Sequence, residues 1–114
     1  MNPSAVKSIQ DAIPVMISAL VNNDLMAVNS LLDKFPRLID MRDRSGRNLL
    51  MLSCYLSNPS MVNYFLSFYV IASHKLDPNA IDNDGLNAYD WAVLGGNEFA
   101  RSLMSKVMDQ EDYE

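Results

Sequence analysis

The most constraining stretch of this sequence runs from Leu76 to Asn97 and places three local signals in a fixed order. It begins with a polar turn rich in Asp and Asn that ends at Gly85, a residue that tolerates the backbone such a turn requires. A short apolar segment of helical character follows, and Gly95-Gly96-Asn97 interrupts it. A second segment with helical periodicity extends from Glu98 to Met108. The stretch therefore predicts a turn followed by two short helices.

The same order of signals occurs earlier in the chain. Residues 42–47 form a polar turn that contains Gly46, and Asn48 is a suitable cap for an apolar helix over 49–56. Ser57-Asn58-Pro59 then interrupts that helix, with the Asn as the next cap and the Pro at the first helical position. An outer helix with one apolar face follows. The chain thus predicts a second unit of a turn and two helices.

The N-terminal third predicts another pair of helices, without a turn glycine. Pro14 suits the first position of a helix over 15–21, and Asn22-Asn23-Asp24 breaks that helix. The Asp can cap the next helix by accepting hydrogen bonds from its free amides. That helix carries apolar residues at a 3.6-residue period until Pro36 ends it. Residues 1–12 are expected to form an extension that covers the end of the helix pairs.

These three units resemble ankyrin repeats. Each repeat of that family has a turn, an inner helix, a tight reversal and an outer helix, and the repeat length is about 33 residues. The Thr-Pro-Leu-His-x-Ala signature of the family corresponds here, in degenerate form, to Asn87-Ala88-Tyr89-Asp90-Trp91-Ala92. Asn replaces the signature Thr in both turn-containing units, and both residue types cap helices. Gly46 and Gly85 lie 39 residues apart, which implies about six inserted residues near 67–75.

The resemblance implies an all-α fold, an ankyrin-like solenoid of stacked antiparallel helix pairs joined by β-turn fingers. Each helix pair has an apolar face that it cannot bury alone, so neighbouring units share a core. We expect one domain, divided into an N-terminal extension (1–12), an N-terminal capping repeat (13–41), a central repeat (42–80) with an insertion near 67–75, a C-terminal capping repeat (81–108) and an acidic tail (109–114).

Composition and charge narrow the function classes. The single cysteine, Cys54, excludes an internal disulfide framework, which suits a reducing cytoplasm. No apolar run approaches the roughly 20 residues that span a membrane, and no secretory signal is recognisable. The net charge of -5 argues against general nucleic-acid binding and is compatible with a basic protein partner. We therefore expect a cytoplasmic protein that engages another protein and neither nucleic acid nor membrane.

The sequence holds no constellation of residues that catalysis or metal binding requires. One His, His74, and one Cys, Cys54, supply too few soft ligands for a zinc site. The Asp82-Asn83-Asp84-Gly85 run fails as a calcium loop, because its first and twelfth positions would be Ala80 and Trp91, which lack side-chain oxygen ligands. We expect no catalytic residue, no cofactor and no bound metal.

Two surface features are candidates for binding. The first turn carries three Arg side chains and the second is dominated by Asp, so the two fingers either form a bipolar edge or pair their charges with each other. The segment 67–73 is more apolar than a linker requires. It is therefore either an exposed interface or a lengthened helix that folds over a neighbouring unit.

Resemblance to ankyrin repeats implies a non-catalytic module that binds a partner protein through its finger turns and inner-helix face. Tyr55 is the preferred anchor, because tyrosine offers a large contact area at a low entropic cost. The alternative is an acidic inhibitor, such as an immunity or anti-defence protein that neutralises a toxin or a nucleic-acid-acting enzyme; self-association also stays open. The expected contact residues are Arg42, Arg44, Ser45, Arg47, Tyr55, Leu56, Ile81, Asn83, Asp84, Leu86 and Leu94.

Overall fold

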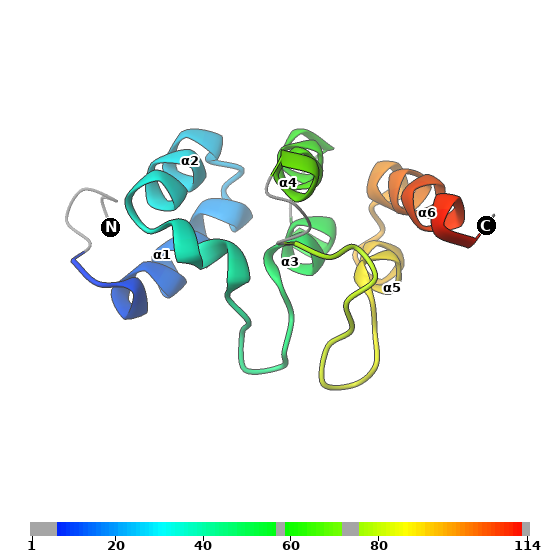
Figure 1. The fold of residues 1–114 in the computed structure, drawn as a ribbon, viewed down its shortest axis with the longest axis horizontal. Coiled ribbons are helices and arrows are strands. Elements are labelled where there is room, and N and C mark those ends of the chain that lie inside the picture. Colours follow the sequence, from blue (N-terminus) through cyan, green and yellow to red (C-terminus); the bar gives the residue numbers. More distant parts are fainter. Residues whose placement is uncertain (1–6, 57–58, 72–75, 113–114) are drawn as a thin grey trace.

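Six α-helices form three antiparallel pairs in the computed structural model, which describes residues 7–56, 59–71 and 76–112 (Figure 1). The pairs are α1 (Ile9–Val21) with α2 (Leu25–Lys34), α3 (Leu49–Leu56) with α4 (Pro59–Ile71), and α5 (Ala88–Leu94) with α6 (Glu98–Asp112). Helices α1, α3 and α5 form one layer, and α2, α4 and α6 form the other (Figure 1). The described part of the chain contains no strand. The predicted all-α solenoid is confirmed.

The stack is elongated, with principal extents of 45 × 28 × 26 Å. The first helix pair and α6 lie at opposite ends of the long axis, and two loops project side by side from the edge of the inner layer (Figure 1). These loops precede α3 and α5, and we call them finger 1 (residues 42–47) and finger 2 (residues 81–86). Their position beside the inner helices creates the face on which the candidate site lies.

Helix α3 lies at the centre of the core. All six residues from Leu49 to Cys54 are buried, and the helix packs against α1, α4 and α5. A helix with neighbours on most of its sides exposes little surface to solvent, here chiefly at Tyr55 near its end, which explains why its sequence is almost entirely apolar. The core cluster continues from Ala12 in α1 to Met104 in α6, so the three pairs share one hydrophobic interior.

Side-chain caps define where the helices begin. Asp24 Oδ1 accepts a hydrogen bond from the Ala27 amide at 3.1 Å, and Asn48 Oδ1 accepts one from the Met51 amide at 2.9 Å. Asn87 forms a reciprocal capping box with Asp90. Each cap satisfies an amide that has no partner inside the helix, a contribution of about 1 kcal/mol. The predicted capping roles of Asp24, Asn48 and Asn87 are confirmed.

The prediction that Pro14 opens the first helix is wrong. Helix α1 begins at Ile9, and Ser8 is its cap, because its Oγ accepts a hydrogen bond from the Asp11 amide at 3.2 Å. Pro14 lies inside the helix with its ring exposed to solvent. Its missing amide removes only one backbone hydrogen bond. The apolar face that continues from Ala12 through Met16 outweighs this loss and keeps the helix intact.

Two helix ends differ from the sequence prediction. A 3₁₀ helix, η2 (Pro36–Asp40), follows α2 where the sequence predicted only a stop, and it buries Leu38 and Ile39. Helix α6 continues to Asp112, beyond the predicted end at Met108. No Gly or Pro follows Met108, so the backbone has no local reason to leave the helix there.

Part of the predicted insertion extends α4, which continues to Ile71. The predicted cap Asn58, the lone His74 and residues 72–75 lie outside the described residues, as do the side chains of residues 68–71. The choice between an exposed interface and a folded-over helix for segment 67–73 therefore stays a prediction.

Replacing Pro14 by Ala should stabilise the protein. The change restores one helical hydrogen bond and removes a steric conflict in α1, while the side chain it removes is exposed. We expect a gain of about 1–2 kcal/mol in the free energy of unfolding, after the greater freedom of the unfolded Ala chain is subtracted. Urea unfolding followed by circular dichroism measures the gain. A loss of stability would show that the proline ring itself packs in α1.

Candidate functional site

Each finger is closed by one aspartate that binds two backbone amides of its own loop. Asp43 Oδ1 accepts hydrogen bonds from Ser45 at 3.0 Å and from Arg47 at 2.8 Å. Asp82 Oδ1 accepts the equivalent hydrogen bonds from the backbone amides of Asp84 and Leu86, both at 2.9 Å. A carboxylate suits this position because one oxygen can accept two amides at once. Gly46 and Gly85 complete the two turns with the same φ of +81°.

Hydrogen bonds between the fingers hold them side by side. The backbone amide of Asn83 donates to the Ser45 carbonyl at 2.9 Å, and its side-chain amide donates to the Arg44 carbonyl at 3.1 Å. From finger 1, Arg42 Nη1 donates to the Ile81 carbonyl of finger 2 at 3.0 Å. It also donates to the Gly46 carbonyl of its own finger at 2.6 Å. The two loops therefore form one unit, in which Arg42 and Asn83 act as ties.

The described residues form no close ion pair between the two fingers. Arg47 forms its ion pair with Asp43 of the same finger at 2.7 Å, and no ion pair joins the two fingers among the described residues. Arg44 and Asp84 are exposed on neighbouring fingers. Of the two alternatives that the sequence left open, this arrangement favours the bipolar edge.

Trp91 joins both fingers to the inner helices. Its Nε1 donates to Asp82 Oδ2 at 2.8 Å, which couples α5 to finger 2. The guanidinium carbon of Arg47 lies 4.8 Å from the centre of a Trp91 ring, within the range of a cation–π interaction. On α3, the Tyr55 ring meets Trp91 edge to face, with centroids 5.1 Å apart and an interplanar angle of 80°. We call Arg47, Tyr55 and Trp91 the aromatic platform.

The electrostatics of the site centre on Asp82. Burial of this carboxyl acts to raise its pKa, but hydrogen bonds from the Leu86 amide, the Trp91 indole and the Asp84 amide favour the charged form. The charge of Arg47 adds to them, and together they hold the pKa below the ordinary value of 3.8. Asp82 is therefore a structural anion that keeps finger 2 closed at neutral pH.

The structure places the predicted contact residues in two groups. Three of them are half-buried: Arg47, Leu56 and Leu86. The others are exposed: Arg42, Arg44, Ser45, Tyr55, Ile81, Asn83, Asp84 and Leu94. Gly95 brings the end of α5 against α3, because a Cβ there would lie 2.7 Å from the Tyr55 carbonyl oxygen.

Sequence reasoning missed Trp91 as a residue of the candidate site, and it missed the exposure of Val93. Trp91 is the centre of the platform, and Val93 is 51% exposed beside Leu94 at 59%. The signal for Trp91 was present, since a half-buried indole requires an acceptor and Asp82 lies nine residues before it. The exposure of Val93 has no such signal in its local sequence.

The single cysteine, Cys54, lies in the hydrophobic core. The Cys54 thiol is fully buried, and burial raises its pKa to about 12, so it stays protonated and unreactive at neutral pH. Within residues 7–56, 59–71 and 76–112, no three His, Cys, Asp or Glu side chains gather as metal ligands do. None of the described helices combines the length and apolar character that a membrane span needs.

Stacked helix pairs with loops projecting from one edge define a repeat protein of the solenoid class. The family model described as ankyrin repeats matches residues 15–113 in three copies, and the chain belongs to the ankyrin repeat family. A comparison with curated proteins found no match. Ankyrin repeats are generally protein–protein interaction modules and are typically non-catalytic. The family resemblance inferred from the sequence is confirmed.

The two finger glycines form a matched pair for testing contact between the fingers. Gly46→Ala and Gly85→Ala should each cost about 1–2 kcal/mol, because both residues have positive φ. A Cβ on Gly46 would also collide with the side chain of Asn83 and meet its backbone nitrogen at 3.0 Å, whereas a Cβ on Gly85 meets nothing within 4 Å. We expect Gly46→Ala to cost about 1–3 kcal/mol more in urea unfolding. Equal costs would show that the fingers separate readily.

Asp82→Asn should change how stability depends on pH. A carboxyl with a lowered pKa stabilises the folded state above its unfolded pKa, and this contribution is lost as pH falls through the folded value. We therefore expect stability of the unchanged protein to fall steeply below about pH 4, and the variant to be less stable at neutral pH with a flatter acid limb. Urea midpoints across pH measure both curves.

Asp84→Asn is the control for this experiment, because its side chain is exposed in the same finger. It changes the net charge equally and should leave the shape of the curve close to that of the unchanged protein. Parallel curves for Asp82→Asn and the unchanged protein would contradict the structural role of Asp82.

Proposed function

We propose that this protein binds a partner protein on the face formed by the finger tips, the aromatic platform and the exposed end of α5. The platform is the observation that carries the proposal. Tyr55 is 40% exposed while its ring is held against Trp91. An aromatic side chain that is fixed before binding loses little entropy on contact, which is the usual property of an interface anchor.

The contacts divide the predicted residues into positioning residues and contact residues. Arg42 and Asn83 use their side chains to tie the fingers together, and Arg47 is engaged with Asp43 and Trp91. These three shape the face. Exposed side chains with no such role in the fingers or platform supply the contact proper: Arg44, Ser45, Ile81, Asp84 and Leu94.

The charged and apolar side chains on this face indicate which kind of partner surface would be complementary to it. Arg44 and Asp84 place opposite charges on adjacent tips, and Tyr55, Val93 and Leu94 expose apolar surface on the inner helices. A complementary partner has an apolar ridge for the helix face, with an acidic group opposite finger 1 and a basic group opposite finger 2. Such a pattern fixes the register of binding, because the reversed orientation would juxtapose like charges.

Tyr55→Ala and Leu94→Glu should each abolish capture of the partner from native lysate. Loss of a central anchor weakens binding by about 2 kcal/mol or more, which is about 30-fold. Met26→Glu is the control, because Met26 is 83% exposed on the outer helix α2, away from the platform. Capture by both the Tyr55→Ala and Leu94→Glu variants together with loss in Met26→Glu would place the interface on the outer layer. Circular dichroism of each variant checks that it is folded.

The acidic-inhibitor hypothesis stays a prediction, and the captured partner allows it to be tested. A charge-steered inhibitor loses association rate steeply as salt rises, whereas a platform-centred interface loses little. Stopped-flow association at low and high salt separates the two.

A further inference from the structure

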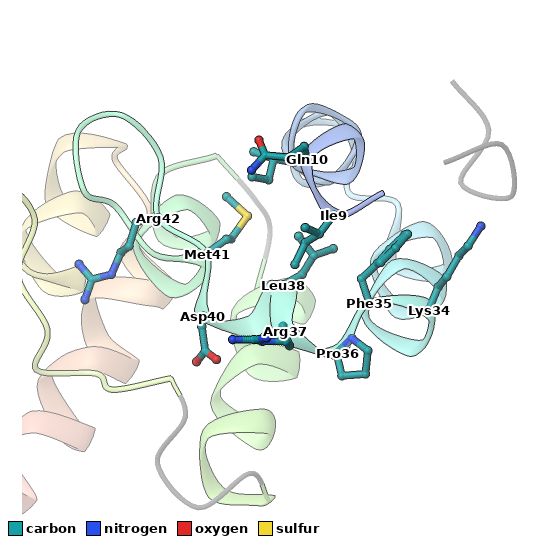
Figure 2. Close-up of a pocket in the computed structure, with 11 residues that line it drawn as sticks. Ile9, Gln10, Lys34, Phe35, Pro36, Arg37, Leu38, Asp40, Met41 and Arg42 are labelled. Carbon is teal, nitrogen blue, oxygen red and sulfur yellow. The ribbon is translucent and has the colours of Figure 1, made fainter. Parts of the chain in front are cut away.

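A groove at the N-terminal end of the stack is separate from the platform. It has a volume of about 670 Å³ and lies between the start of α1 and the segment from Lys34 to Arg42 (Figure 2). Ile9, Ile13 and Phe35 contribute incompletely buried apolar surface to it. This volume is within the usual range of sites that hold a ligand or an anchoring side chain.

The groove is positively charged in an acidic protein. Lys34 and Arg37 line it beside one carboxylate from Asp40, although the whole chain has a net charge of -5. Arg42 also lines it, but its guanidinium donates to carbonyls of the two fingers. The two halves of the sequence also differ in net charge. Residues 1–56 hold six Lys or Arg and five Asp or Glu, whereas residues 57–114 hold three and nine. The excess negative charge therefore belongs entirely to the C-terminal half.

The acidic end and the basic groove cannot meet within one molecule. Helix α6 ends at the far side of the stack from the first helix pair, along an axis of 45 Å (Figure 1). The sequence from Asp109 to Glu114 carries four carboxylates and one aromatic residue, Tyr113. This composition complements an apolar groove rimmed by cations.

We propose that the groove binds the acidic C-terminal segment, residues 109–114, of a second copy of this chain. Tyr113 supplies the apolar anchor and the surrounding carboxylates face Lys34 and Arg37. Because donor and acceptor lie at opposite ends, the contact is heterologous and each copy keeps one unused groove and one unused segment. Copies therefore associate head to tail into open chains, in a manner independent of the partner-binding face.

Other occupants fit the groove less well. Residues 1–6 of the same chain contain no carboxylate, so they offer no charge complement to Lys34 and Arg37. A nucleic acid would bring many phosphates to a groove lined by few cations, in a protein whose overall charge repels it. The acidic segment of a second copy matches both the charge and the apolar surface.

Sedimentation velocity of the full chain tests the proposal. At low salt we expect the mean mass to rise continuously with concentration, without stopping at a dimer, and to return to that of a monomer in high salt. Deletion of residues 109–114 should give a monomer at every concentration. A monomeric full chain, a closed dimer, or association that survives the deletion would each overturn the proposal. Tyr55→Ala should associate normally, which separates this result from the fate of the proposed function.

A labelled peptide with the sequence of residues 107–114 tests the groove directly. We expect it to bind the truncated chain, and Arg37→Glu to weaken it about tenfold or more. Lys106→Glu is the matched control, because it makes the same charge change on exposed α6, outside the groove. A peptide in which Asp109, Glu111 and Asp112 are Lys should bind Arg37→Glu better than the unchanged groove. Equal weakening by both variants, or peptide binding only after residues 1–6 are deleted, would contradict the assignment.

Discussion

Two carboxylates, Asp43 and Asp82, give the fingers the shape from which the rest of the site follows. Each holds two amides of its own loop with one oxygen, and each uses the other oxygen on a side chain of the site: Arg47 Nε for Asp43 and Trp91 Nε1 for Asp82. Once the loops are closed, their facing carbonyls and amides can bond between fingers. The same two interactions bring Arg47 over Trp91. Finger shape and platform are therefore one connected structure.

This connection explains why the charged residues of the fingers have unequal roles. A side chain that satisfies a buried or backbone partner cannot leave it for a second protein without exposing that partner's unmet hydrogen bond. Asp82 and Arg47 are held in this way, whereas Arg44 and Asp84 are exposed. The sequence analysis placed Arg47 among the contact residues together with Arg44 and Asp84. The contacts separate the residues that build the face from those that are available to touch a partner.

Local signals in the sequence predicted most of the fold, because its units are short and each carries its own caps and breakers. Helix α3 was correct to the residue, since Asn48 caps it and a break follows Leu56. Pro14 misled the prediction because proline usually marks a helix start, whereas here it lies inside α1 at the cost of one backbone hydrogen bond. The platform was out of reach of local reasoning, since Arg47 and Trp91 meet only when two units stack. Asp43 and Asp82 stand at the same distance in sequence before Gly46 and Gly85. This shared spacing was a sequence signal, unused in the prediction, that the two aspartates close the fingers.

The linear architecture also separates the surfaces that the molecule offers. In a globular domain, two interfaces compete for area and often overlap, but a solenoid has a side and two ends that share few residues. The fingers and platform occupy the side of the second and third units, and the basic groove belongs to the first unit. Only Arg42 belongs to both, and its guanidinium is already committed to carbonyls of the two fingers. A copy bound at the groove would therefore leave the platform open, so association along the axis and recognition at the side are compatible in the same molecule.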